Sequence, residues 1–456
     1  MNTNRLHNEG GRHTAGGAPR RMLPAVIVLL GMSLLMAGAS LGTPQIDASY
    51  GDQMGWFSAE INAMGGTGAA LYRGGFSTVF NPALLSRADN YRLDAAMVLD
   101  QEHEDRFQPL FDSFDSYVTD AAIASNRDHY FATGFALAGR PAGEQSPFGV
   151  GLSLTDRYPF DYTFGEELRN PSPYPPGNGE PARDMIIEER GREVSGTLRD
   201  LSVGVGYDLA DRVSLGVAAH YAFGTRTEIM RDRDFVTPEN SYHHQSDFDL
   251  DGVNFTLGAQ GVVSDRIEIG VAWESKLSAT GDWTQTDYEA STDQTTETMS
   301  DAYFKYPQSF RAGLTFRPQT DPRTVFTMEL EYKTWSDLED WRVPGDDNPQ
   351  HLEDTTDVRI GLQHSFYNGM DARFGFRHYE SFLDKEATAS VFSAGVGAPF
   401  GSGMFSASVE LAKVTSIQAH QFPYPASYFG DSFVVDPMAR VEDTRFRIGA
   451  GYKVEF

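Results

Sequence analysis

The sequence predicts an all-β protein, a transmembrane outer-membrane β-barrel of about 14 antiparallel strands with an N-terminal hatch in its lumen, and three observations support this. Apolar and polar residues alternate through most of the chain after residue 90. The connections between alternating segments are mostly long and short in turn. The last eleven residues alternate strictly and end in Phe456. Lipid on one face of a strand and a polar lumen on the other require this period of two, because successive side chains point to opposite faces.

The first 39 residues are predicted to be a secretory signal peptide. Two arginines precede an apolar run at residues 23–37, and the Ala-Gly-Ala tripeptide at 37–39 provides a small-x-small cleavage site. A retained membrane anchor is the alternative, but the run is short for a bilayer. No Cys follows the run, which argues against a lipoprotein. The absence of Cys from the whole chain suits an oxidising compartment and excludes thiolate–metal sites.

The composition disfavours other membrane and binding classes. After residue 39 no stretch approaches 20 apolar residues, and the mean hydropathy is -0.39, so helical membrane spans are not expected. The formal net charge of -27 disfavours nucleic acid as a partner. The 45 Gly, 20 Tyr and 31 Phe fit crowded strands and the aromatic girdles of a barrel.

Fourteen segments alternate clearly enough to predict strands. They are residues 91–100, 129–140, 147–156, 194–209, 211–225, 248–263, 265–280, 300–317, 323–336, 354–366, 370–382, 388–398, 402–415 and 443–456. The long connections are 101–128, 157–193, 226–247, 281–299, 337–353 and 416–442. Barrels of this class have short periplasmic turns and long outer loops, and an even strand number places both termini in the periplasm. A soluble β-sandwich, the alternative, gives no reason for this asymmetry.

Residues 40–90 are Gly-rich and alternate weakly, so they are predicted to form a hatch rather than a strand. The segment Asn62 to Asn90, NAMGGTGAALYRGGFSTVFNPALLSRADN, resembles the hatch of the FadL-type long-chain fatty acid transporters, with Asn81-Pro82-Ala83 as the matching tripeptide. The segment Tyr306 to Asp337 is similar to paired mid-barrel strands of that family. The resemblance implies a signal peptide at 1–39, a hatch at 40–90 and a barrel at 91–456.

The hatch motif has a structural and a functional interpretation. Asn81-Pro82 can simply set a turn where the hatch meets the wall, because Pro fixes its own φ and restricts the residue before it. The functional interpretation is that this turn holds the plug in the lumen. Gly65 and Gly66 permit close packing or positive φ. They do not form a phosphate loop, because no Lys-Ser/Thr follows them.

Arginines on the polar faces of the late strands are predicted to point into the lumen. We take Arg311, Arg359, Arg373 and Arg377 as candidate ligand-binding residues, because a guanidinium group can donate two hydrogen bonds to a carboxylate. The alternative is that these arginines pair with Glu329, Glu331, Glu410 and hatch acids to make the interior rigid.

The first long connection is predicted to carry an apolar helical face. Phe107, Phe111 and Phe114, together with Leu110, Tyr117 and Val118, have helical spacing. Such a face outside the cell would capture a hydrophobic ligand, or would pack on the barrel rim.

Metal binding and catalysis find little support. Asp247, Asp249, Asp251 and Gly252 imitate the start of an EF-hand, but the twelfth position is Gly258 and the spacing also matches a strand. We therefore predict no metal and no cofactor. The chain lacks a G-x-S-x-G elbow, so we predict that it is not an enzyme.

The resemblance implies an outer-membrane channel for passive uptake of hydrophobic small molecules, with long-chain fatty acids or hydrocarbons as the default substrates. Expected partners are that ligand, outer-membrane lipid and lipopolysaccharide, and the barrel assembly machinery, for which Phe456 resembles the recognition signal. The alternative is a PorV-like barrel that acts as a docking platform, and an outer-membrane hydrolase is a third option. Apolar lumen residues beside the hatch favour transport, whereas a filled interior and an apolar loop patch favour docking.

Overall fold

The computed structural model describes residues 48–51, 55, 57–141, 146–171, 181–210, 212–340, 351–382, 388–422, 424, 428–429, 433–435 and 438–456. The predicted signal peptide lies outside these residues and stays a prediction. Within the described ranges, no helix is long and apolar enough to cross a membrane.

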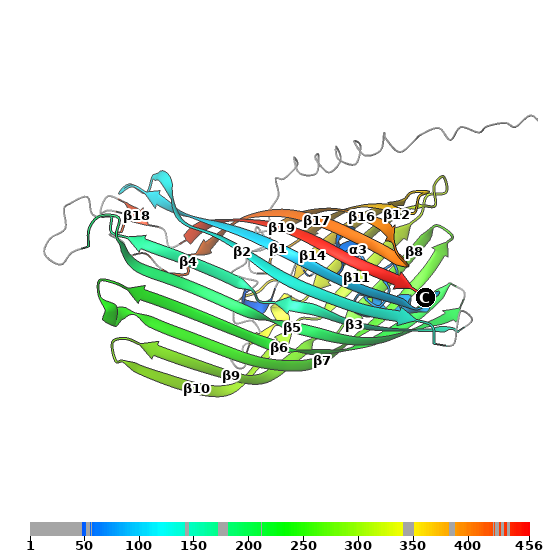
Figure 1. The fold of residues 1–456 in the computed structure, drawn as a ribbon, viewed down its shortest axis with the longest axis horizontal. Helices are drawn as coiled ribbons and strands as arrows, with labels where there is room; N and C mark the ends of the chain where they lie inside the picture. Colours follow the sequence, from blue (N-terminus) through cyan, green and yellow to red (C-terminus); the bar gives the residue numbers. More distant parts are fainter. Residues whose placement is uncertain are drawn as a thin grey trace, which may run out of the picture. The chain divides into compact units, whose positions relative to one another are not determined.

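The described chain forms a closed antiparallel β-barrel (Figure 1). Its 19 strands are β1 (Arg92–Phe111), β2 (Tyr117–Gly139), β3 (Phe148–Pro159), β4 (Tyr162–Arg169), β5 (Ile186–Ala210), β6 (Val213–Asp234), β7 (Tyr242–Ser264), β8 (Ile267–Glu274), β9 (Leu277–Glu289), β10 (Gln294–Tyr306), β11 (Ser309–Phe316), β12 (Thr324–Lys333), β13 (Glu339–Asp340), β14 (Thr355–Ser365), β15 (Asp371–Tyr379), β16 (Ala389–Phe400), β17 (Gly403–Ala419), β18 (Val434–Val435) and β19 (Met438–Glu455). Five barrel strands are each broken in two, as β3/β4, β8/β9, β10/β11, β12/β13 and β18/β19, so 19 segments make 14 barrel strands. The predicted strand number is confirmed.

The barrel closes where its first and last strands meet. β1 pairs with both β2 and β19. Tyr91 and Phe456 exchange two backbone hydrogen bonds of 3.2 and 2.9 Å, and their rings stack with centroids 6.0 Å apart. Phe456 therefore completes the barrel seam, in addition to its predicted part in assembly. We call this end of the barrel, marked C in Figure 1, the C-terminal end, and the opposite end the far end.

The alternation in sequence becomes an alternation of burial. Along β1 the side chains of Leu93, Met97 and Leu99 are exposed on the outer face, whereas those of Asp94 and Asp100 are buried in the lumen. An outer apolar face is stable against lipid, and inward polar groups are stable only when paired.

The strands are longer than predicted at the far end. Residues 101–128, expected to be a loop with a helical face, continue β1 and β2, and only residues 112–116 form the turn. Phe107 and Phe111 therefore lie on a strand, and Phe114 lies at the tip, 86% exposed. The helix prediction was wrong because the alternation of apolar and polar residues is weak here: the inward positions are polar and the outer face is only partly apolar. The two strands nevertheless continue to pair through their backbones up to the turn. Hairpins β6–β7 and β9–β10 lengthen in the same way.

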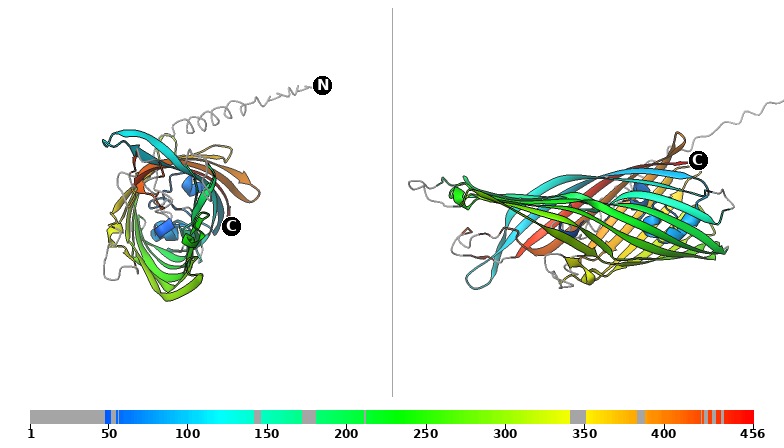
Figure 2. Two further views of the ribbon diagram at one scale, coloured as in Figure 1. Left: turned by 90° about the vertical axis from the view of Figure 1, so that its left-hand side faces the viewer. Right: turned by 90° about the horizontal axis from the view of Figure 1, so that it is seen from below.

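Residues 57–90, which we call the plug, lie inside the ring of strands (Figure 2, left). The plug contains α3 (Ala59–Asn62), α4 (Ser77–Phe80) and the 3-10 helix η1 (Pro82–Arg87); two further 3-10 turns, η2 (Pro238–Asn240) and η3 (Trp335–Asp337), belong to the barrel connections. Its first helix contacts β16, β17 and β19, and η1 contacts β3, β5, β6 and β7. The plug thus bridges distant parts of the wall.

Inward-facing glycines allow this close fit. A Cβ atom at Gly149, Gly216, Gly258 or Gly270 would overlap Leu85, Pro82–Ala83, Asn81 or Ala69 of the plug, respectively. Several wall glycines therefore lie where the plug backbone touches the wall. Close approach of the plug is thus a reason for the high Gly content, besides the predicted crowding of strands.

Candidate functional site

The wall strand made of β3 and β4 breaks in the middle of the barrel. β3 ends at Pro159, whose ring nitrogen cannot donate to a ladder. The pairing of β3 with β5 also shifts register between Asp156 and Tyr158, and Gly196 on β5 has a φ of +114° there. A bulge of this kind bends a strand and changes the direction of its side chains.

The end of β3 reaches across the lumen. Tyr158 stacks on Tyr306 of β10, with ring centroids 4.3 Å apart and planes 11° apart. Arg157 donates hydrogen bonds of 3.1 Å to both Asp200 of β5 and Asn254 of β7, and it pairs with Glu274 of β8. We call Arg157 and Tyr158 the β3 tongue.

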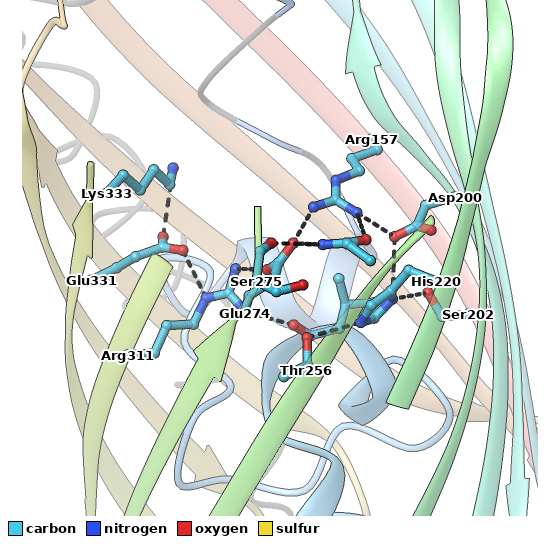
Figure 3. Close-up of polar contacts among 12 residues, drawn as sticks. Arg157, Asp200, Ser202, His220, Thr256, Glu274, Ser275, Arg311, Glu331 and Lys333 are labelled. Carbon is cyan, nitrogen blue, oxygen red and sulfur yellow. Dashed lines mark hydrogen bonds and ion pairs between the residues drawn. The ribbon is translucent and has the colours of Figure 1, made fainter. Parts of the chain in front are cut away.

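A chain of polar contacts continues from the tongue along the wall (Figure 3). Arg311 donates to Glu274 at 2.9 Å and to Glu331 at 2.7 Å, and the ammonium of Lys333 lies 3.7 Å from Glu331. At the other end, His220 lies between Ser202 and Thr256, with both contacts at 2.8 Å. These charges satisfy one another inside the barrel, as buried ions must.

A cavity of about 90 Å³ lies between the plug, the tongue and this wall. We call it the plug cavity. It is lined by Gly55, Phe57, Val79, Phe80, Thr155, Asp156, Arg157, Tyr158, Glu274, Pro307, Ser309, Arg311, Glu331, Lys333, Trp335 and Arg359. One part of the lining is aromatic and the other part is charged, so the cavity is amphipathic.

On the far side of the tongue the lumen contains an apolar cluster together with buried ion pairs such as Arg106–Glu104 and Arg226–Glu228. The cluster is formed by side chains from strands, from connections and from the chain before the plug, and it includes Tyr50, Phe160, Phe164, Phe248, Phe304, Trp335, Phe382 and Phe422. Tyr306 belongs to this cluster and also holds the tongue. Trp335 belongs to the cluster and also lines the plug cavity, and Tyr158 of the tongue packs against both, so the cluster and the cavity meet at the tongue.

The wall has a gap in its ladder beside the tongue. β2 pairs with β3 only through Gly134–Gly139, and in the described residues no ladder joins the rest of β2 to β4. A small cavity of about 40 Å³ lies at this gap and is lined by Val98, Asp100, Tyr130, Phe131, Ala132, Asp156, Pro159, Asp161, Arg445 and Arg447. Phe131 is 57% exposed on the outer face. We call this place the wall gap.

Asn81 anchors the plug from the inside. Its side-chain amide donates to the carbonyl of Ala69 at 2.7 Å and to that of Ala259 on β7 at 3.1 Å, and it accepts from the Ala83 amide at 3.1 Å. The side chain is fully buried. Asn81 thus satisfies backbone groups of both plug and wall, and Pro82 begins η1 directly after it.

Glu60 forms a second anchor, on α3 of the plug. It pairs with Lys453 at 2.8 Å, Arg92 at 3.6 Å, Arg73 at 3.7 Å and Arg373 at 3.9 Å. Burial by itself would raise the pKa of Glu60, but these four positive charges together outweigh it and hold the pKa well below its ordinary value.

The predicted lumen arginines divide into two groups. Arg311 and Arg359 line the plug cavity. Arg373 and Arg377 lie beside the first part of the plug, where Arg373 pairs with Asp371 at 2.6 Å and Arg377 lies 3.6 Å from Glu410. The predicted pairing with acids is confirmed, and the binding of a ligand by these residues stays a prediction. Gly65 and Gly66 have φ values of +67° and +78°, as the hatch interpretation allows.

Sequence reasoning missed Arg157, Tyr158, Ser309 and Lys333. The signal for the tongue was Pro159, because a proline within an alternating run marks a strand end or a bulge. Ser309 and Lys333 face each other across the β11–β12 ladder, but nothing in their own sequence context distinguishes them from other inward residues. The acidic run Asp247, Asp249 and Asp251 lies in β7, so strand periodicity accounts for its spacing.

Comparison with known proteins supports the fold. A family model described as BamG matches residues 181–413, half of the chain. Similar solved structures include a Pseudomonas aeruginosa FadL homologue (13% identity, 92% of this chain and 100% of that chain, TM-score 0.60) and the P. putida toluene transporter TodX (14%, 89% and 99%, 0.59). The Ralstonia pickettii toluene transporter TbuX is also similar (16%, 89% and 99%, 0.55). The comparison with curated proteins finds no match. The FadL-type architecture inferred from the sequence is confirmed.

Proposed function

The chain belongs to the BamG family, and we propose that it is an outer-membrane channel for the passive uptake of small hydrophobic molecules. One observation carries the proposal: an apolar cluster in the lumen borders an amphipathic cavity that touches the plug and shares Asp156 with the cavity at the wall gap. A barrel that served only as a scaffold would need no apolar cluster in its lumen.

The proposed route has three stages. A ligand enters at the far end and partitions into the apolar cluster around Phe248 and Phe304. Displacement of the tongue, held by the Tyr158–Tyr306 stack, then admits it to the plug cavity. From the plug cavity the ligand leaves past the plug or sideways through the wall gap. Asp156 lines both the plug cavity and the small cavity at the wall gap, which supports the sideways exit.

We place the far end outside the cell and both termini in the periplasm. The turn at residues 112–116 would then be exposed to the medium, and the turn at residues 317–323 would face the periplasm. Because the chain has no Cys, a single introduced Cys can report the orientation of the barrel without labelling at other positions of the protein. Ser113→Cys should react with an impermeant maleimide on intact cells, and Thr320→Cys should react only after lysis. The reverse result would overturn the orientation.

We propose small hydrocarbons, in addition to fatty acids, as candidate substrates. TodX and TbuX are toluene transporters by name, and an apolar lumen is compatible with hydrocarbons as well as with fatty acids. At about 90 Å³ the plug cavity is smaller than a cavity of about 150 Å³ that holds benzene, so its lining must move to admit toluene and must move further to admit a long acyl chain.

Uptake by whole cells tests the proposal. The full chain is expressed in a host without its own hydrophobic channels, and the uptake of labelled toluene and labelled oleate is compared with that of cells carrying an empty vector. We expect toluene uptake to rise several-fold, with oleate as the second probe. If neither probe enters faster than in the vector cells, although the folded barrel is present, the channel proposal fails.

A second candidate function is a docking platform, and two observations favour it. Buried ion pairs surround the plug, among them Arg359–Glu329 and Arg373–Asp371. The tip of the β1–β2 hairpin exposes Phe114, Tyr117 and Val118 at 86%, 59% and 48%. Apolar side chains that project this far are typical of protein contacts. Every outer-membrane barrel meets the barrel assembly machinery, which makes that complex the first partner to test.

Site-specific photocrosslinking distinguishes this candidate. A photoreactive residue at position 114 should capture a defined component of the assembly machinery, whereas one at position 320, at the C-terminal end of the barrel, should not. Stable capture together with an absence of toluene uptake would favour docking over transport.

A further inference from the structure

The outer face of the wall carries a groove of about 710 Å³ that runs across β7, β8, β11 and β12. These four segments are neighbours in the sheet. We call this feature the outer groove. Its side chains face away from the lumen, and Val271, Phe310 and Leu330 are 52%, 46% and 45% exposed. The outer groove is therefore open to the surroundings of the barrel, and it is separate from the cavities of the lumen.

Small side chains contribute to the floor of the outer groove. The register of the four strands places one outward residue of each strand in a single row, which consists of Ala259, Val271, Ala312 and Leu330. Ala259 and Ala312 carry only a methyl group as a side chain, so the surface is low at these two positions.

Larger side chains border this floor on both sides. On the far-end side, the next row consists of Trp273, Phe310 and Tyr332, one from each of three adjacent strands. On the C-terminal side, the next row consists of Ile269, Leu314 and Met328. A row that contains two alanines between two rows of large side chains is a hollow, and this accounts for the groove.

The aromatic row of the outer groove has polar partners on its far-end side. The indole N–H of Trp273 donates to Gln308 at 3.1 Å, and the hydroxyl of Tyr332 donates to Asp354. Aromatic side chains with an apolar body and a polar tip are favoured at the border between the hydrocarbon layer and water. The floor of the outer groove therefore lies just inside the hydrocarbon layer.

Among the described residues that border the outer groove, no charged side chain faces it. Arg311 and Glu331 border it through their strands, but their side chains point into the lumen, where Arg311 donates to Glu331 at 2.7 Å. An uncharged hollow in the hydrocarbon layer fits a hydrocarbon chain, whereas a charged partner would lose its hydration there without gaining an ion pair.

We propose that the outer groove seats one acyl chain of a membrane lipid, with the polar head group beyond the aromatic row. Lipid surrounds this face of the barrel. A chain in the hollow contacts the floor and both bordering rows, whereas on a flat part of the wall it contacts only the outermost side chains. Between helices or chains in lipid, the quality of packing decides which contact persists. The site faces the membrane, so the proposal goes beyond transport and does not depend on it.

A lipid with brominated acyl chains tests the proposal, because bromine quenches tryptophan fluorescence on contact and Trp273 borders the groove. Brominated phosphatidylcholine is titrated into the purified full-length barrel in detergent. This two-chain lipid is far larger than the lumen cavities of about 90 and 40 Å³, so it reports on the outer face.

The variants Ala312→Phe and Ala259→Phe each fill the floor of the groove. Ala450→Phe is the matched control, because it adds the same ring to the outer face of β19, which pairs with none of the four strands. Heat modifiability of each variant shows whether its barrel is folded.

In wild type we expect quenching that saturates with a single lipid per barrel. Ala312→Phe and Ala259→Phe should raise the half-saturating lipid concentration about tenfold, since the loss of about ten carbon–carbon contacts corresponds to a factor of that size. Ala450→Phe should behave as wild type does, and Trp273→Phe should lose the saturable signal.

Two results would overturn the proposal. Quenching that rises without saturation, or that is equal in the floor variants and in Ala450→Phe, would mean ordinary lipid contact. A wild-type dimer that dissociates in Ala312→Phe, measured by light scattering in detergent, would assign the outer groove to a second copy of the chain.

Discussion

Tyr158 and Tyr306 stack face to face across the lumen, with centroids 4.3 Å and planes 11° apart, although their strands are not neighbours in the sheet. The contact joins the end of β3 to the opposite wall. It lies where the apolar cluster borders the plug cavity, and the break at Pro159 makes it possible. We therefore propose this strand end, in addition to the plug, as a constriction of the proposed route.

Tyr158→Ala should increase uptake. Loss of the stack removes one side of the constriction, and the cost to the free energy of unfolding should be about 1 to 3 kcal/mol, which a closed barrel can tolerate. Initial rates of toluene uptake should rise above wild type. Tyr221→Ala is the matched control, because Tyr221 lies on the outer face, 44% exposed. A Tyr158→Ala rate equal to that of the control would show that the tongue does not limit passage.

Asn81→Ala should loosen the plug without preventing assembly. The substitution leaves the carbonyl groups of Ala69 and Ala259 without their shared donor, at a cost of about 1 to 3 kcal/mol. We expect a normal heat-modifiable barrel, faster proteolysis within residues 57–90, and altered uptake. Asn368→Ala, in the turn after β14, is the control. Unchanged protease sensitivity of the plug would count against an anchoring role.

Gly258→Ala should disturb the same contact from the wall side. The new Cβ would overlap the Oδ1 of Asn81 and lie 2.9 Å from the Cδ of Pro82, and overpacking of this kind costs about 1 to 3 kcal/mol. Gly261→Ala on the same strand is the control, since its Cβ would lie 3.5 Å from Ile269. The melting temperature should fall only for Gly258→Ala.

A double mutant gives the sharper result for this contact. Because Asn81→Ala removes the overlapping atom, Gly258→Ala should cost less in that background. Additive losses of stability would mean that the two residues do not interact.

Glu60→Gln should remove the pH-dependent ion pairs that fix α3 of the plug to the wall. The pKa of Glu60 is lowered from its ordinary value of 4.5, because four basic groups outweigh the effect of burial. A lowered pKa in the folded state contributes stability that is present above pH 4.5 and is lost as the pH falls through the lower folded value. Hydrogen exchange of residues 57–66 should therefore accelerate in wild type as the pH falls below about 4.5.

In Glu60→Gln the same amides should exchange faster at neutral pH, with a flatter response to acid, corrected for intrinsic exchange rates. Glu239→Gln, on the η2 turn of the β6–β7 connection, is the control. An identical acid response in wild type and Glu60→Gln would assign the effect to other carboxylates.

Much of the architecture followed from the sequence by itself. Alternation along single strands, as in the run from Phe446 to Phe456, depends only on the two faces of a strand, so it predicted the barrel and the strand number. The Asn-Pro-Ala tripeptide marked the plug, and the arginines of the late strands were correctly placed in the lumen beside acids. Those features are local, because each is set by the residue and its immediate neighbours.

The candidate site was decided only by the tertiary structure. Arg157 meets Glu274 across 117 positions of sequence, and Ser309 and Arg359 share a cavity because their strands curve around the same plug. The far-end parts of the strands were predicted to be loops because both of their faces carry polar residues, so the sequence shows no alternation there. Backbone hydrogen bonds nevertheless keep these segments paired. Contacts across a lumen depend on strand tilt, breaks and plug position, and these follow from the closure of the whole barrel rather than from any one segment.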